Sequence, residues 1–327
     1  MELAIAPIRT IIMGGHHWFT RGRIDADGRA MLLQETSRYV LTMKLKSTIL
    51  TTLLLSSAVQ LNAAEPPRPI SIEAYGTYGS YAGSVERNNL TSETVAIDYT
   101  METFGASAAI RNWDLSRITS LGDLDGTDTN VLLYTRKKVG NEGYWGVTAA
   151  ATYLSNNDNN TDQTFAPYGA VAYKTADGGN YFDVGYASIG FEDTTNNQFT
   201  ATWGVALFNR YVWAQTRLYY GNLSNTVQDV SQTIALEERL TWYVVPHTFS
   251  LTFYGLVGQR IYGYDPDTRI VYSLSDVQQG SAGLTANWEL TPSLGLFADV
   301  AYEAYEKQTI NDNYSATYGT VGLKYKF

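Results

Sequence analysis

Side chains suited to acid–base chemistry are few in this sequence of 327 residues. Beyond residue 63 the chain holds a single histidine, His247, in a segment that indicates a tight turn after Pro246. A Ser–His–carboxylate arrangement needs a histidine base held beside its nucleophile, and a short turn offers no such support. The chain has no cysteine, which excludes thiolate nucleophiles and thiolate metal sites. With no phosphate loop, zinc spacing or nucleotide fingerprint, the sequence predicts neither enzymatic activity nor a bound cofactor.

Two pairs of aspartates have the chemistry to bind a hard cation such as Ca²⁺, whose ligands are oxygen atoms. They are Asp123 with Asp125, and Asp265 with Asp267. Acidic loops that simply face water are more common than calcium sites. We therefore predict no metal site and keep Ca²⁺ binding as the alternative.

The segments that would carry functional side chains alternate with a period of two. In "FTATWGVALF", Phe199, Ala201 and Trp203 share one face, and Thr200 and Thr202 share the other. Such alternation is typical of β-strands. Counting these segments predicts fourteen strands, with twelve or sixteen as alternatives. The predicted strands are residues 70–82, 92–101, 104–114, 129–138, 144–154, 164–174, 180–191, 198–208, 211–222, 232–243, 248–261, 279–290, 294–306 and 314–327.

The connections between these segments are of two kinds that alternate along the chain. Short ones, such as residues 140–143 and 176–179, alternate with longer ones rich in Asp and Asn, such as "SNNDNNTDQ" and "NLSNTVQDVSQ". This order predicts strands that run up and down between a face of short turns and a face of long loops.

A closed barrel in a membrane explains these strands better than a soluble sheet does. Strands of β-sandwiches are shorter, about five or six residues, and a long open sheet leaves edges that promote aggregation. In a bilayer every backbone polar group must be paired, which only ring closure achieves for strands. Tilted membrane strands need about nine to eleven residues. The sequence therefore predicts an all-β fold, a transmembrane antiparallel up-and-down β-barrel, over residues 64–327.

Aromatic residues cluster at both ends of the predicted strands, as expected for belts at the two membrane–water boundaries. Ordinary core aromatics are the alternative. At the short-turn end they are Tyr144, Trp145, Tyr181, Phe182, Tyr211, Trp213, Trp242, Tyr243, Tyr325 and Phe327. At the long-loop end they are Tyr153, Phe191, Phe199, Tyr262, Tyr264, Tyr302 and Tyr314.

Fourteen strands lie between the filled eight-stranded barrels and the water-filled porins, so we expect a lumen. The alternation predicts that it is lined by Glu73, Asp98, Arg111, Arg136, Asp183, Arg217, Arg239, Glu289, Asp299 and Glu303, with Lys138, Glu237, Lys324 and Lys326 on the same face. The alternative is that these charges form paired ladders without a role in selectivity. Glu237, Glu238 and Arg239 cannot all face inward, which predicts a bulge or an incorrect strand assignment.

Inward-facing aromatic rings are a further candidate feature, because they could stack on sugars. They are Tyr75, Tyr81, Trp213, Tyr219 and Phe297. We expect them to belong to the aromatic belts or to fill space, with sugar binding as the alternative.

The N-terminal part has the features of export. Residues 43–63 combine Lys44 and Lys46, an apolar run and a small residue at Ala63, which predicts a secretory signal peptide. The run is too short for a membrane anchor. Residues 1–42 then indicate an over-called gene start, with an unusually long signal n-region as the alternative. Seven of the 23 basic and four of the 32 acidic residues precede Ala64, so residues 64–327 carry a net charge of −12, which argues against nucleic acid as a partner.

The C-terminal pattern Thr320-x-Gly322-x-x-Tyr325-x-Phe327 resembles the β-signal of bacterial outer-membrane barrels. This resemblance implies a Gram-negative outer membrane, recognition of Gly322, Tyr325 and Phe327 by the barrel-assembly machinery, and contact with lipid and lipopolysaccharide. Size and strand number resemble the OmpG-type monomeric porins, which implies a monomer. The acidic segments and the ending resemble YaiO-type outer-membrane proteins. Neither resemblance rests on a specific motif, so neither assigns functional residues.

These observations predict a channel for passive diffusion of small hydrophilic solutes. The alternative is a non-conducting barrel with a structural or surface-binding role. An outer-membrane enzyme is the third hypothesis, and it would have to use His247.

Overall fold

The computed structural model describes residues 69–118, 122–140 and 143–327. The predicted signal peptide, residues 43–63, and the predicted over-called start, residues 1–42, lie outside the described residues. In the part of the chain that is described, no helix has the length and apolar character needed to cross a membrane.

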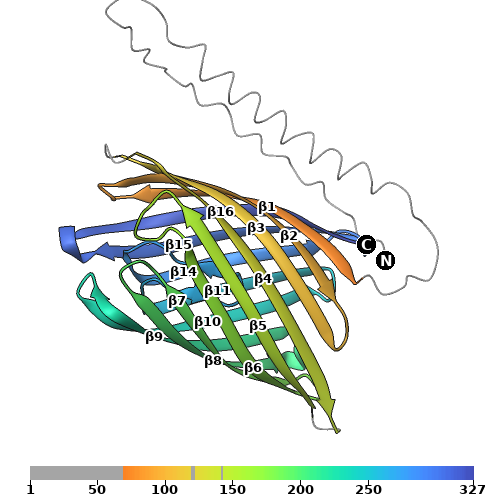
Figure 1. Ribbon diagram of the computed structural model, residues 1–327. Coiled ribbons are helices and arrows are strands. Elements are labelled where there is room, and N and C mark those ends of the chain that lie inside the picture. The colour runs from red at the N-terminus through yellow and green to blue at the C-terminus, as the bar shows by residue number, and fades with distance from the viewer. Residues whose placement is uncertain (1–68, 119–121, 141–142) are drawn as a thin grey trace, which may run out of the picture. The chain divides into compact units, whose positions relative to one another are not determined.

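Fourteen antiparallel strands form one closed barrel, as predicted (Figure 1). Each strand pairs with its neighbour in the chain, and β1 pairs with β16 to close the ring. The barrel strands are β1 (Ile70–Ala82), β2 (Arg87–Thr100), β3 (Phe104–Arg117), β4 (Leu124–Val139), β5 (Gly143–Asn156), β6 (Thr164–Thr175), β7 (Asn180–Gly190), β8 (Thr195–Leu207), β9 (Val212–Val227), β10 (Val230–Val245), β11 (Phe249–Arg260), β14 (Val277–Glu289), β15 (Leu294–Lys307) and β16 (Asp312–Lys326). The remaining elements are a two-stranded hairpin, β12 (Tyr264–Asp265) with β13 (Ile270–Val271), and the 3₁₀ turns η1 (Phe208–Arg210) and η2 (Gln308–Ile310).

Most connections predicted to be long are short, because the strands continue past the predicted ends. The predicted loop at residues 222–232 is almost entirely strand: β9 runs to Val227 and β10 begins at Val230. Between them Gln228 and Asp229 both have positive φ, 51° and 61°, which is the geometry of a tight hairpin turn. Outside the bilayer a strand needs no apolar face, so polar residues can extend it.

The two faces of the barrel wall differ in the way a lipid-embedded ring requires. Large apolar side chains are exposed on the outside, for example Val95, Val184 and Val321. Their neighbours in the chain point inward and include the buried Thr94 and Asp183. The period of two therefore separates a face suited to lipid from a polar interior.

The prediction of an aromatic belt at the long-loop end is partly wrong. Tyr153, Phe199 and Tyr302 are exposed on the outside as expected. The other four predicted belt residues are buried inside the barrel: Phe191, Tyr262, Tyr264 and Tyr314. Their burial results from the connection between β11 and β14, which folds inward and brings Tyr262 and Tyr264 with it. At the short-turn end Trp145, Phe182, Trp242 and Phe327 are exposed, and Tyr325 is half-buried beside Phe327. The other predicted belt residues line cavities inside the barrel: Tyr144, Tyr181, Tyr211, Trp213 and Tyr243.

The last residue is held in place by the first strand. The backbone N–H of Phe327 donates a hydrogen bond to the carbonyl of Ile70, 2.9 Å away, and the rings of Tyr325 and Phe327 meet edge to face at 4.9 Å. The end of the chain is thus part of the barrel closure.

Candidate functional site

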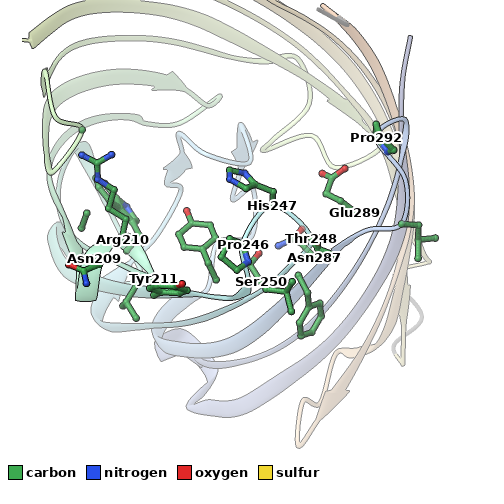
Figure 2. Close-up of a pocket in the computed structure, with 18 of the residues that line it drawn as sticks. Asn209, Arg210, Tyr211, Pro246, His247, Thr248, Ser250, Asn287, Glu289 and Pro292 are labelled. Carbon is green, nitrogen blue, oxygen red and sulfur yellow. The ribbon is translucent and has the colours of Figure 1, made fainter. Parts of the chain in front are cut away.

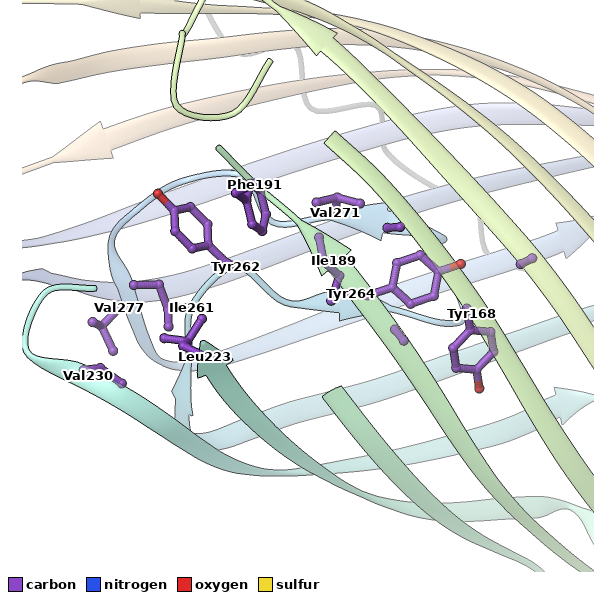
Figure 3. Packing of buried hydrophobic residues seen from close by; sticks show 13 residues of the cluster. Tyr168, Ile189, Phe191, Leu223, Val230, Ile261, Tyr262, Tyr264, Val271 and Val277 are labelled. Carbon is purple, nitrogen blue, oxygen red and sulfur yellow. The ribbon is translucent and has the colours of Figure 1, made fainter. Parts of the chain in front are cut away.

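The candidate site is built around the inward loop, residues 261–276, which connects β11 to β14. Within it β12 and β13 pair as a small hairpin, Tyr264 opposite Val271 and Asp265 opposite Ile270. Figure 3 shows this hairpin running beside the inner face of the barrel strands. The turn forms locally because the carboxylate of Asp265 accepts hydrogen bonds from the backbone N–H groups of Asp267 (2.8 Å) and Thr268 (3.2 Å).

Aromatic rings fix the inward loop against one side of the wall. Tyr264 is fully buried, and its ring centroid lies 5.3 Å from that of Tyr168 on β6. Tyr262 stacks on Phe191 at 4.1 Å. Burying one such large side chain contributes about 1.5–3 kcal/mol. The same cluster contains Ala150, Ala166, Ala187, Ile189, Leu223, Val230, Ile261, Val271 and Val277.

Two amides on β8 satisfy the backbone of the inward loop. Asn196 Nδ2 donates to the carbonyls of Ile261 (3.2 Å) and Tyr262 (3.0 Å). Gln198 donates to the carbonyl of Tyr264 (2.7 Å) and accepts from its N–H (3.0 Å). Buried backbone groups need such partners, so these side chains replace the neighbouring strand that the loop lacks.

The inward loop also reaches the far wall of the lumen. Thr152 on β5 donates from Oγ1 to the carbonyl of Arg269 at 3.0 Å, and Arg269 donates from Nη1 to Ser107 Oγ on β3 at 2.5 Å. Strands β3 and β5 lie on the opposite side of the ring from β11 and β14. The loop therefore crosses the lumen from one wall to the other.

A charged cluster lies at the tip of the inward loop. Asp267 accepts two hydrogen bonds from Arg217 on β9, at 2.8 and 2.9 Å, and its carboxylate lies 2.8 Å from Arg239 Nη1 on β10. Partial desolvation among the lumen side chains would raise the pKa of the Asp267 carboxyl, although this side chain is open to the lumen on one side. The two guanidiniums outweigh this effect and hold that pKa below its ordinary value. Asp267 is thus ionised at neutral pH and ties the loop to the wall.

A second group of contacts holds the C-terminal part of the inward loop near the end of the barrel opposite the short turns. Arg87 on β2 forms an ion pair with Asp276, and the Tyr314 hydroxyl donates to the same carboxylate. Leu274 packs against a cluster from β1, β3, β4, β5, β15 and β16. The members of that cluster are Tyr81, Trp113, Leu115, Leu124, Leu154, Tyr305, Tyr314 and Ala316.

The short-turn end of the barrel contains a cavity of about 1330 Å³. Figure 2 shows Glu289 and His247 projecting into it, with Tyr211 and Pro246 at the wall. Lys326 pairs with Glu289 at 2.8 Å on its lining. A smaller cavity of about 430 Å³, lined by Gly146, Thr148 and other residues, lies beside β4 to β7. The cavity walls therefore combine apolar surface with polar groups and carry charges of both signs.

The structure places the ten charged residues that were predicted to line the lumen on the inner side of the wall, but it does not gather them into one site. Arg217 and Arg239 meet at Asp267, as described above. Near the short-turn end Glu73 pairs with Lys324, Glu289 with Lys326, and Arg136 binds the carbonyl of Glu102. On β3, Arg111 pairs with Asp128.

The remaining four are spread over the wall. Asp299 accepts hydrogen bonds from Tyr254 (3.1 Å) and Thr285 (2.6 Å), and Glu303 accepts one from Tyr305. Asp183 is buried and Asp98 is half-buried. Their roles in conduction stay predictions.

The expectation that Glu237, Glu238 and Arg239 require a bulge or an incorrect strand assignment is wrong, because all three lie within β10. Pairing of β10 with β9 and β11 is regular there, with Glu237 and Arg239 inward. Glu238 points outward, where the Thr216 hydroxyl donates to its carboxylate at 2.8 Å. The structure tolerates this acidic group on the outer face.

The aspartate pairs serve the fold. The Asp123 carboxylate accepts a hydrogen bond from the backbone N–H of Arg117, and the Asp125 carboxylate accepts one from the side-chain amide of Asn157. Asp265 stabilises the turn of the inward loop, and Asp267 pairs with Arg217. In the described ranges no group of three or more His, Cys, Asp or Glu side chains is placed to hold a metal. Sequence reasoning missed Asn196, Gln198 and the role of Asp267, because these depend on partners about 50 to 70 residues away in the chain.

No protein family and no curated protein matches this chain. Solved structures do. A bacterial polysaccharide outer-membrane secretin has a TM-score of 0.50 at 11% identity, covering 80% of this chain and all of that chain. A FadL homologue from Pseudomonas aeruginosa has a TM-score of 0.50 at 8% identity, covering 79% and 90%. The toluene transporter TodX from Pseudomonas putida has a TM-score of 0.49 at 8% identity, covering 80% and 90%.

Similarity at these identities concerns the fold alone. It does not assign the chain to the OmpG-type or the YaiO-type proteins, and both resemblances stay predictions. The closed ring, its apolar exterior and its similarity to the secretin and the FadL homologue together give the chain the fold of a bacterial outer-membrane β-barrel.

Proposed function

We propose that this protein is a channel for passive diffusion of small hydrophilic solutes across the outer membrane of a Gram-negative bacterium. The observation that carries the proposal is the cavity of about 1330 Å³ inside a closed ring, whose lining carries charged groups of both signs. We further propose that the chain is exported by the signal peptide at residues 43–63, assembled by the barrel-assembly machinery and active as a monomer.

The inward loop defines how this channel would be controlled. It crosses the lumen between β8–β10 and β3–β5, so solutes must pass beside it or wait for it to move. Because the cavity lies at the short-turn end, and short turns face the periplasm in this class of barrel, the loop separates the outer mouth from a periplasmic vestibule.

An enzymatic role has less support. His247 has a positive φ of 62° in its turn, and Glu289 on the same cavity is paired with Lys326. We therefore assign His247 no catalytic role. If His247→Ala abolished a measured hydrolysis of lipid or peptide, that assignment would be wrong.

Planar-bilayer recording of the purified protein tests the channel. We expect discrete ion currents, and larger ones from a variant in which residues 264–271 are replaced by Asn-Gly. Gly263 and Tyr272 are already close enough to be joined by a two-residue turn, since the N–H of Tyr272 donates a hydrogen bond to the carbonyl of Gly263 at 2.8 Å. Heat-unfolded protein is the control. Silence from both folded proteins would overturn the channel and leave the non-conducting barrel.

A further inference from the structure

We propose that Arg217 and Arg239 form a binding site for the carboxylate of a solute, and that Asp267 occupies this site until such a solute displaces it. The inference rests on the proposed channel function and adds a solute class to it: small hydrophilic molecules that carry a carboxylate.

Arg217 is oriented by the wall and not only by the loop. Its Nε donates to Thr202 Oγ1 on β8 at 2.9 Å, while Nη1 and Nη2 each bind one oxygen of Asp267. The Arg217 side chain is only 5% exposed. With Nε fixed to β8, both Nη atoms stay directed into the lumen when the loop leaves.

Arg239 is held in the same manner. Its Nε donates to Glu237 Oε1 at 2.5 Å on its own strand. Nη1 lies 2.8 Å from Asp267, and Nη2 lies 3.8 Å from Asp265. The two guanidiniums therefore come from adjacent strands and meet at one carboxylate, although Arg217 Nη1 also donates to the Tyr219 hydroxyl on the wall at 3.4 Å.

This arrangement matches a carboxylate better than other solute groups. A guanidinium binds the two oxygens of a carboxylate through parallel hydrogen bonds, which is how Arg217 already holds Asp267. Glu237 and Asp183 are buried on the neighbouring wall. These acids offset part of the positive charge, which favours one carboxylate over a polyanion.

Asp267 is accessible to a competing solute. Its side chain is 36% exposed, unlike its guanidinium partner on β9. A solute can therefore approach the pair from the lumen and exchange one carboxylate for another. Asp267 lowers the apparent affinity of the site, because only the fraction of molecules with a displaced loop can bind.

Isothermal titration of the folded, detergent-solubilised protein tests the site without relying on conduction. The probes are D-glucuronate and D-glucose, sugars that differ by one carboxylate. We expect glucuronate to bind and glucose not to bind. We expect Asp267→Asn to tighten the binding of glucuronate at least about tenfold, because the change removes the competing carboxylate. The double change Arg217→Gln with Arg239→Gln should abolish binding.

Lys324→Gln is the matched control, since Lys324 pairs with Glu73 near the short-turn end and should leave binding unchanged. Folding of each variant is checked by its mobility in unheated gels. If the double variant fails to fold, Arg217→Lys keeps the charge but loses the fork, and it should still weaken binding.

Planar-bilayer currents separate the two proposals. If the wild type conducts while glucuronate and glucose behave alike and Asp267→Asn changes neither, the carboxylate site is overturned and the channel stands. If no protein conducts but glucuronate binds as expected, the site stands and the channel is overturned.

Discussion

Gly322 occupies a position on β16 that leaves no room for a side chain. A Cβ atom there would lie 2.4 Å from the ring of Phe297 on β15 and 2.5 Å from Cβ of Tyr75 on β1. The rings of Tyr75 and Phe297 meet edge to face at 5.5 Å. The glycine of the predicted assembly signal thus has a packing reason of its own.

Replacing Gly322 by alanine is therefore expected to destabilise the folded barrel by about 1–3 kcal/mol, the cost of overpacking. The urea midpoint of refolded protein measures this. Gly319→Ala on the same strand is the control, because nothing lies within 4 Å of its Cβ position. Equal midpoints for the two variants would contradict the packing argument.

Glu238 places a carboxylate among exposed apolar side chains near the middle of β10, with Leu236 and Leu240 on the same face. An acidic group facing hydrocarbon costs free energy even when Thr216 binds it. Glu238→Leu should raise stability in lipid vesicles by on the order of 1 kcal/mol. The control is Glu192→Leu in the connection between β7 and β8, which should not raise stability. A loss of stability in Glu238→Leu would contradict a lipid-facing position of Glu238.

The inward loop is the element whose position should respond to acid. The pKa of Asp267 is lowered in the docked state by Arg217 and Arg239, against the opposing effect of burial. A lowered pKa means that the docked state gains stability above the ordinary value of 3.8 and loses it as the pH falls through the lowered value.

Acidification through that lowered pKa should therefore release the loop tip. Faster tryptic cleavage at Arg269, measured after brief acid exposure and crosslinking, would report it. Asp267→Asn removes this titration, so its cleavage rate should be high at neutral pH and change less with acid. Glu237, Asp265 and Asp183 are further acidic side chains near the tip, and a response that persists unchanged in Asp267→Asn would show that Asp267 is not the responsible group.

The strands could be predicted from the sequence, whereas the inward loop could not. Alternation is local, so Phe199 and Thr200 already show to which face each belongs. The loop depends on contacts between distant segments, such as Tyr264 with Tyr168 and Asp267 with Arg217. Residues such as Tyr262 fit an aromatic belt by composition, and only the course of the chain shows that they lie inside. The period of two predicted which face of the wall each charged side chain occupies, but it did not predict the residue with which each one pairs.

At the scale of the whole molecule, closure depends on β1 and β16, which pair from Ser71 with Lys326 to Ala82 with Ser315. Phe327 adds one hydrogen bond beyond this ladder, to Ile70. Such a bond contributes only about 0.5–1.5 kcal/mol. The last residue therefore contributes little to the stability of the folded barrel. Its resemblance to an assembly signal implies that its main role is in assembly.

Deleting Phe327 should consequently leave the urea midpoint of refolded protein nearly unchanged and strongly reduce the amount found in outer membranes of expressing cells. Deleting Lys326 and Phe327 together also removes the ion pair with Glu289 and should lower the midpoint. A large fall in the midpoint for the single deletion would show that the residue acts through the fold.

The hydrogen bond from Tyr272 to Gly263 brings the two ends of residues 264–271 together at one point of the inward loop. The wall is complete without the eight residues between them. A peptide of another sequence grafted at this junction would hang inside a ring that stays the same. The barrel therefore offers a frame for nanopore sensing, in which the grafted peptide, rather than the frame, sets which analyte interrupts the current.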